Sequence, residues 1–72
     1  MNLNELEFNQ IRERVKSLLQ LRPMTLAELT YEAGSFGEAH LLLVIRWLED
    51  KGAVIRDEQM RYTWRKQFRL RL

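Results

Sequence analysis

Basic and aromatic side chains alternate over residues 61–72, in the stretch RYTWRKQFRLRL. Arginine and lysine neutralise phosphate groups, and aromatic rings such as those of Tyr62 and Trp64 stack on bases. This mixture indicates a polyanion partner, with DNA as the first candidate. The stretch contains no acidic residue, and its positive charges come from Arg61, Arg65, Lys66, Arg69 and Arg71.

The distribution of charge along the chain places any such binding near this stretch. Residues 1–60 contain seven basic and ten acidic residues and have a net charge of −3. Residues 61–72 have a net charge of +5, which gives the +2 of the whole chain. A polyanion should therefore bind close to the basic stretch. For residues 61–65 a second interpretation is favoured: a strand whose aromatic side chains pack on the third helix and whose arginines, Arg61 and Arg65, are only solvated.

Catalysis and metal binding both lack the residues that they need. The chain has no cysteine and a single histidine, His40, so it offers neither a nucleophile–base pair nor a set of metal ligands. It also contains no glycine-rich phosphate loop. We therefore expect no enzymatic activity and no cofactor. His40 is a candidate for a phosphate contact, although a lone histidine in the first turn of a helix is more often an ordinary surface residue.

Length and composition are typical of one small globular domain. Hydrophobic residues make up 46% of the 72 residues and charged residues 31%, as in ordinary soluble proteins. No apolar run approaches the roughly 18 residues of a membrane span. The start, MNLNELEF, lacks the basic and apolar regions of a secretory signal. We expect a cytoplasmic protein that does not enter a membrane.

The first predicted helix covers residues 5–21. Asn4 and Glu7 have the spacing of a capping box, in which each side chain accepts a hydrogen bond from the backbone of the other residue. Apolar residues then recur at helical spacing. Pro23 disfavours helical geometry at the residue before it and ends the segment.

Two further capping boxes are predicted, over Thr25–Glu28 and over Ser35–Glu38. The first begins a short helix over residues 26–33, which Gly34 is expected to end in the left-handed conformation. The second begins a third helix that runs to Gly52. Its residues Leu41, Val44 or Ile45, and Leu48 are the expected core positions.

After the third helix the apolar period changes from about 3.6 residues to 2. Residues 53–56 are a short strand candidate and residues 57–59 a turn. From Met60 to Leu72 apolar residues fall mainly on even positions and cations mainly on odd positions, as in a strand with one apolar face. The last part is ambiguous, because Trp64, Phe68 and Leu72 are also spaced four apart, as on one face of a helix.

The segments TLAELTYEAG (25–34) and RWLEDKGAVIR (46–56) resemble the winged helix-turn-helix superfamily over roughly residues 8–65. The resemblance implies an α+β fold, with a three-helix helix-turn-helix core followed by a C-terminal β-hairpin wing. The expected winged-helix domain covers residues 1–65, and residues 66–72 are a basic extension of the last strand. The resemblance also implies a DNA-binding or transcription-regulatory factor whose third helix enters the major groove.

The third helix departs from the chemistry of a DNA reader. Its outward positions are predicted to carry Leu42, Leu43 and Arg46, whereas base reading requires several side chains such as arginine, lysine or asparagine. Glu38 would face phosphates unfavourably, and the turn at residues 57–59 is acidic where a DNA-binding wing usually offers cations.

Two hypotheses follow. The first is a nucleic-acid-binding protein that contacts phosphates through Arg46, His40 and the basic C-terminal residues, and the base rate of the superfamily places it slightly ahead. The second is a protein-interaction winged helix, either a homodimer or an adaptor, because the chain has more apolar residues than a three-helix core needs. Its predicted interface comprises Leu42, Leu43, Trp47, Phe68, Leu70 and Leu72.

Overall fold

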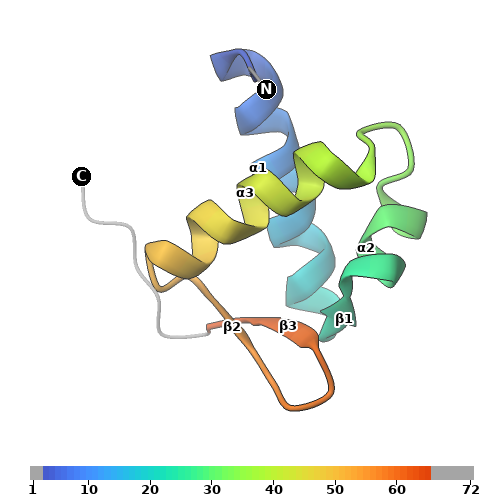
Figure 1. The fold of residues 1–72 in the computed structure, drawn as a ribbon, viewed down its shortest axis with the longest axis vertical. Helices are drawn as coiled ribbons and strands as arrows, with labels where there is room; N and C mark the ends of the chain where they lie inside the picture. Colours follow the sequence, from blue (N-terminus) through green and yellow to red (C-terminus); the bar gives the residue numbers. More distant parts are fainter. Residues whose placement is uncertain (1–2, 66–72) are drawn as a thin grey trace.

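The computed structural model describes residues 3–65. Within it the chain forms an α+β fold of three helices and a small antiparallel sheet, as predicted from the sequence. Helix α3 crosses α1, α2 lies to one side, and the sheet lies at the C-terminal end of α1 (Figure 1). The elements, in chain order, are α1 (Glu5–Leu21), β1 (Met24–Thr25), α2 (Leu26–Glu32), α3 (Glu38–Asp50), β2 (Val54–Arg56) and β3 (Arg61–Trp64).

The hairpin of β2 and β3 is joined by a strand that the sequence pattern did not predict. The strand order is β1-β3-β2, and both pairings are antiparallel. Met24 pairs with Tyr62 and Thr25 with Arg61. On the other side of β3, Val54 pairs with Trp64. A strand of two residues is too short to show a period of 2, so β1 is recognisable only from its partner.

The hydrophobic core lies where α1, α2, α3 and the sheet meet. The expected core positions of α3 are confirmed, because Leu41, Val44, Ile45 and Leu48 are all buried. Each such side chain contributes about 1.5–3 kcal/mol through burial of apolar surface. The other core residues are Ile11, Val15, Leu18, Leu19, Met24, Leu29, Ala33, Ala53, Val54 and Tyr62.

The N-termini of α1 and α2 are both capped by side chains. At α1, Asn4 Oδ1 accepts from the backbone N–H of Glu7 at 2.7 Å, while the Glu7 carboxylate accepts from the Asn4 side-chain amide instead of its backbone. At α2 the capping box is complete: Glu28 N–H donates to Thr25 Oγ1 at 3.2 Å, and Thr25 N–H donates to Glu28 Oε1 at 3.0 Å. The predicted boundaries of α1 are confirmed.

Glu28 also forms an ion pair, with Arg22 Nη1 3.0 Å from Glu28 Oε2. The hydrogen bond from the Thr25 backbone and the bond from Arg22 lower the pKa of the Glu28 carboxyl, because both favour its charged form. The start of α2 is therefore held by an ionised carboxylate at neutral pH.

The predicted capping box of the third helix is wrong. The N-cap of α3 is Gly37, with φ +82° and ψ 148°, and no side chain caps the helix. Glu38 is therefore the first residue of the helix and cannot reach back as the third residue of a capping box does. The connection is longer than predicted, and Phe36 within it packs against the core.

Gly34 does not end α2 in the left-handed conformation that the sequence suggested. The C-cap is Ala33, with φ −105°, and its N–H donates to the carbonyl of Leu29 at 2.8 Å. In residues 3–65 the glycines with positive φ are Gly37 and Gly52.

The end of α3 at Gly52 is confirmed and takes the form of a Schellman motif. Gly52 has φ +80°, a value that residues with a Cβ rarely adopt. Its N–H donates to the Glu49 carbonyl at 3.0 Å, and Ala53 N–H donates to the Leu48 carbonyl at 2.9 Å. This tight reversal directs the chain straight into β2.

The turn between β2 and β3 extends to Met60, which was expected to belong to the last strand. Asp57 and Arg61 are joined by a bond from Asp57 N–H to the Arg61 carbonyl at 2.9 Å, and Met60 N–H donates to the Asp57 carbonyl. Met60 has φ +65° and an exposed side chain. A type I turn that ends in one left-handed residue closes hairpins of this kind, so position 60 is used by the turn.

Candidate functional site

The arginines of the basic stretch that the structure describes are bonded within the chain. Arg61 Nε lies 3.0 Å from Asp57 Oδ2 in an ion pair. Arg65 Nη1 donates to the carbonyl of Gly52 at 3.1 Å. Both guanidinium groups retain other N–H donors, but each is oriented by an internal acceptor. The remaining predicted phosphate contacts of this stretch, Lys66, Arg69 and Arg71, lie outside the described residues.

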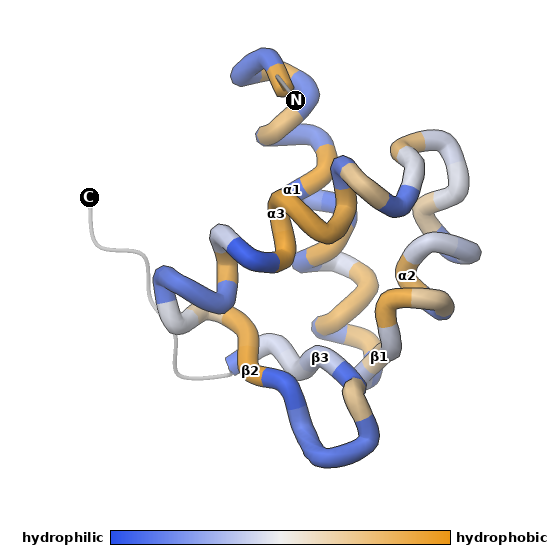
Figure 2. The backbone as a smooth tube through the Cα atoms, viewed as in Figure 1, coloured by the Kyte–Doolittle hydropathy of each residue, from blue (hydrophilic) through white to orange (hydrophobic). Residues whose placement is uncertain are grey.

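The wing tip, residues 57–60, is anionic. Asp57 Oδ1 accepts from the backbone N–H groups of Gln59 at 2.8 Å and Arg61 at 3.0 Å. The bond from the Arg61 backbone, with the Arg61 guanidinium, lowers the pKa of the Asp57 carboxyl. Glu58 beside it is exposed, and the loop between β2 and β3 is mostly hydrophilic (Figure 2), apart from the exposed Met60. Phosphate groups would be repelled by these carboxylates.

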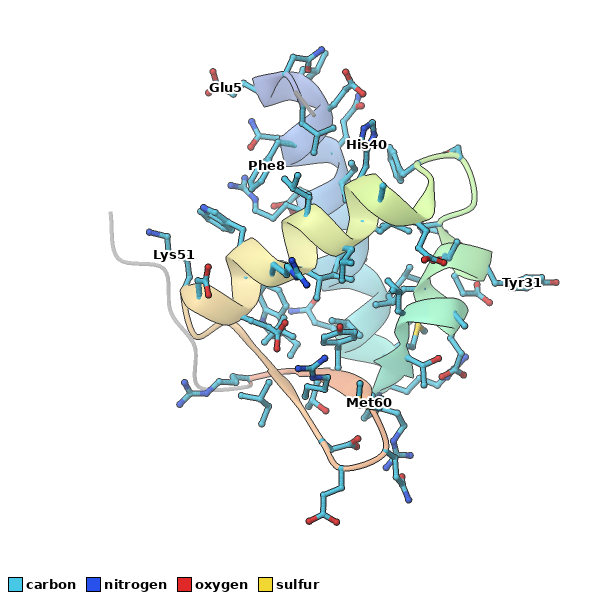
Figure 3. The ribbon with its side chains drawn as sticks, viewed as in Figure 1. Glu5, Phe8, Tyr31, His40, Lys51 and Met60 are labelled. Carbon is cyan, nitrogen blue, oxygen red and sulfur yellow. The ribbon has the colours of Figure 1, made fainter. Side chains whose placement is uncertain are left out.

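The outward face of α3 mixes apolar, basic and acidic side chains. Its exposed residues at helical spacing are Ala39, Leu43, Arg46 and Asp50. Arg46 can read a base edge, but Asp50 lies one turn away on the same face. His40 is half-buried near the start of α3 (Figure 3). The face therefore lacks the set of donors that a recognition helix requires.

A groove of about 800 Å³ lies between α1, α3 and β3. A volume of this size is typical of binding sites. Both tryptophans of the chain line it, together with the C-terminal half of α1. Its apolar lining residues are Leu19, Leu21, Pro23, Trp47, Leu48 and Trp64. Its polar lining residues are Arg12, Glu13, Lys16, Gln20, Arg22 and Thr63.

Trp47 is held at the groove by contacts on two sides. Its ring meets the ring of Phe8 from α1 edge to face, with centroids 5.1 Å apart and planes at 88°, a geometry that aromatic pairs prefer. Lys51 Nζ lies 5.6 Å from the centre of the Trp47 ring. Figure 3 labels Phe8 on α1 and Lys51 at the end of α3. These neighbours leave the tryptophan half-buried.

Trp64 forms the opposite wall, from the last residue of β3. Its pairing with Val54 and its packing against the core fix the ring. Lys16 Nζ lies 5.8 Å from the ring centre, so a cation from α1 covers part of it. Tyr62, two residues earlier on the same face, is buried. The aromatic residues of 61–65 therefore pack inward. The favoured interpretation was wrong in two details: β3 packs mainly on α1 and not on the third helix, and Arg61 and Arg65 are bonded within the chain instead of being only solvated.

The structure separates the predicted interface residues. Trp47 lines the groove, and Leu43 lies one helical turn before it with 39% of its surface exposed. Leu42 is half-buried on the other flank of α3. Phe68, Leu70 and Leu72 lie outside the described residues.

Leu21 is the groove residue that sequence reasoning missed most clearly. It is 78% exposed at the end of α1. Its position in the sequence could have indicated this exposure. Leu21 does not belong to the regularly spaced apolar residues of the first helix, and it directly precedes Arg22 and Pro23, where the helix ends. Arg12 and Lys16 gave no such signal, because cations on a solvated helix face are ordinary.

In residues 3–65 no group of three or more histidine, cysteine, aspartate or glutamate side chains could hold a metal ion. None of the helices in that range is long and apolar enough to cross a membrane.

Comparison with known proteins identified no relative: no family model, no curated protein and no solved structure matches this chain significantly.

Proposed function

We propose that this chain is a protein-interaction module of the winged-helix type, in the cytoplasm, and that the groove between α1, α3 and β3 is its docking surface. The observation that carries the proposal is the exposed apolar lining of the groove, which includes both tryptophans, Trp47 and Trp64, and Leu21, a leucine that is 78% exposed at the end of α1. Tryptophan is one of the residue types enriched at the hot spots of protein interfaces.

The other surfaces support this choice over DNA reading. In a winged helix that reads DNA, the third helix and the wing present cations and amides to the duplex. Here the outward face of α3 offers Arg46 beside Asp50, and the wing tip offers Asp57 and Glu58. On both surfaces these carboxylates would repel the phosphate groups of DNA.

A display library of random peptides of about 16 residues tests the docking function. The bait is the full chain, in its native form and as Leu21→Glu. We expect enriched peptides that bind the native chain and lose at least about tenfold in affinity for Leu21→Glu, because a charge then replaces an exposed apolar contact of the groove. Leu6→Glu is the matched control, since Leu6 is 68% exposed at the other end of α1. Failure to enrich any peptide, or equal binding to both variants, would refute the proposal.

Nucleic-acid binding through the basic C-terminal end is the second candidate, supported by the +5 charge of residues 61–72. It predicts binding to random duplex DNA that weakens steeply with salt, since each neutralised phosphate releases counterions. The quadruple substitution of Arg65, Lys66, Arg69 and Arg71 by alanine should abolish binding, with Leu21→Glu as the control that leaves it intact. No mobility shift with duplex at low salt would refute this candidate.

A further inference from the structure

We infer that the partner docked in the groove is an acidic peptide segment with bulky apolar side chains, an inference that rests on the proposed docking function. The groove is apolar at its floor and cationic at its rim. Three features favour this partner over a second copy of the chain. They are the charge of the rim, the concave shape of the groove and the sequence that follows Arg65.

The rim is more basic than the domain around it. Three basic residues and one acidic residue line the groove, a net charge of +2. Residues 3–65 together contain nine basic and ten acidic residues, a net charge of −1. The positive charge is therefore concentrated at the groove. A surface of one sign around an apolar site favours partners of the opposite sign and disfavours like-charged ones.

The cations of the rim are placed to face a bound segment. Arg12 and Lys16 are four residues apart on α1 and so lie on the same side of the helix. Arg12 Nε is 3.7 Å from Glu13 Oε2, a long contact between partly solvated side chains that contributes little. Lys16 lies over the Trp64 ring, so a carboxylate that meets Lys16 would also bring its neighbouring apolar side chain to the tryptophan.

Arg22 completes the rim at the end of α1. It pairs with Glu28 at 3.0 Å, and 53% of its side chain remains exposed. A guanidinium has five N–H donors, so Arg22 can keep the Glu28 contact and still donate to a carboxylate of the partner.

A second copy of the chain does not fit the groove. A two-fold interface at this surface would place one concave groove against another and the cations of one rim against those of its mate. The segment that follows Arg65 in the same chain adds Lys66, Arg69 and Arg71 and no acidic residue. An acidic, convex segment of another protein satisfies both the charge and the shape.

The peptides enriched by the native chain provide the first test. Their mean net charge should be clearly negative relative to the starting library. The tightest of them is then synthesised in three forms, with its acidic residues kept, replaced by their amides, or replaced by lysine. Fluorescence polarisation should give at least about tenfold weaker binding for the amide form and still weaker binding for the lysine form. Raising salt from about 50 to 300 mM should narrow these differences.

Charge reversal on the chain provides the second test. Arg12→Glu should weaken the acidic peptide at least about tenfold and strengthen the lysine form. Arg46→Glu makes the same change of charge outside the groove and should alter neither affinity by more than about twofold. The peptide series needs no variant, so it decides the question even if Arg12→Glu were to unfold.

The experiments distinguish a failure of the acidic-partner inference from a failure of the proposed docking function. Enriched peptides that bind at the groove regardless of their charge overturn the inference and leave the docking function standing. Absence of any enriched peptide overturns both. Sedimentation as a dimer that Leu21→Glu dissociates, or duplex DNA binding that Arg12→Glu abolishes, would assign the groove to a different occupant and also overturn the inference.

Discussion

The two ends of α3 are built differently although a glycine with positive φ stands at each. At Gly37 no side chain caps the helix, and a Cβ added there would meet nothing within 4 Å. At Gly52 the chain closes a Schellman motif, and an added Cβ would lie 3.4 Å from Arg65 Nη1. The groove lies beside this second, tightly packed end. The N-terminal end of α3, which in a recognition helix would contact DNA, has no side-chain cap.

The largest effect should come from Trp47. Trp47→Ala removes the contact with Phe8 and part of the groove wall, and we expect it to lower the free energy of unfolding by about 2–4 kcal/mol. His40→Ala, at the other end of α3, should change it by less than about 0.5 kcal/mol. Urea unfolding at neutral pH measures both. Equal losses for the two variants would show that the ends of α3 do not differ as described.

The two glycines provide a direct comparison. Alanine at either position must adopt a positive φ, at a cost of about 1–2 kcal/mol. Gly37→Ala should cost more than Gly52→Ala, because Gly37, with φ +82° and ψ 148°, lies close to a region that is essentially restricted to glycine, whereas Gly52 has the conformation usual at the end of a Schellman motif. Thermal or urea unfolding of the pair decides the order. The reverse order would mean that the loop before α3 relaxes to accept a side chain and that the end at Gly52 is the more constrained one.

The start of α2 shows what the start of α3 lacks. Thr25→Ala removes the side-chain acceptor of the complete capping box and should destabilise the protein by about 1 kcal/mol. Ser35→Ala should cost less than about 0.5 kcal/mol, because Gly37 and not Ser35 stands at the N-cap of α3. If Ser35→Ala lowered the free energy of unfolding as much as Thr25→Ala, Ser35 would act as a cap of α3 after all, as predicted from the sequence.

The smallest effect should be a dependence on pH. Because the folded state lowers the pKa of Glu28, its contribution is fully present above the ordinary glutamate pKa and is lost as the pH falls through the lowered value. The loss therefore sets in as the pH falls below the ordinary glutamate value of 4.5. Glu28→Gln should therefore flatten the fall in urea midpoint between pH 7 and 3, and Asp57→Asn should do so for the same reason. Parallel pH profiles for native protein and Glu28→Gln would contradict the role of the ionised cap.

The local signals in the sequence predicted most of the fold. Apolar spacing and the residues that end helices located α1, the core face of α3 and the reversal at Gly52, since these depend on neighbours within a few residues. The start of α3 was misplaced because Ser35 and Glu38 have the right spacing while Phe36 between them is drawn to the core. Strand β1 was missed because its partner in β3 is more than thirty residues away.

The candidate site was only partly predictable for the same reason. Trp47 was identified as a possible anchor from its residue type alone. Its companions Leu21, Lys16 and Trp64 come from two other elements, and only the crossing of α1 and α3 over the end of β3 brings them together. No pattern within a single segment of the sequence indicates that these side chains lie in one groove.

The strand order has a consequence for synthesis of the protein. The central strand of the sheet, β3, is also the last of the described strands to be made, while β1 is the first. During translation the three helices and both outer strands are synthesised before Arg61–Trp64 exists to pair with them. Contacts between helices can form as the chain leaves the exit tunnel, but neither the pairing of β1 nor the part of the groove that Trp64 lines can form until Arg61–Trp64 has left the tunnel as well.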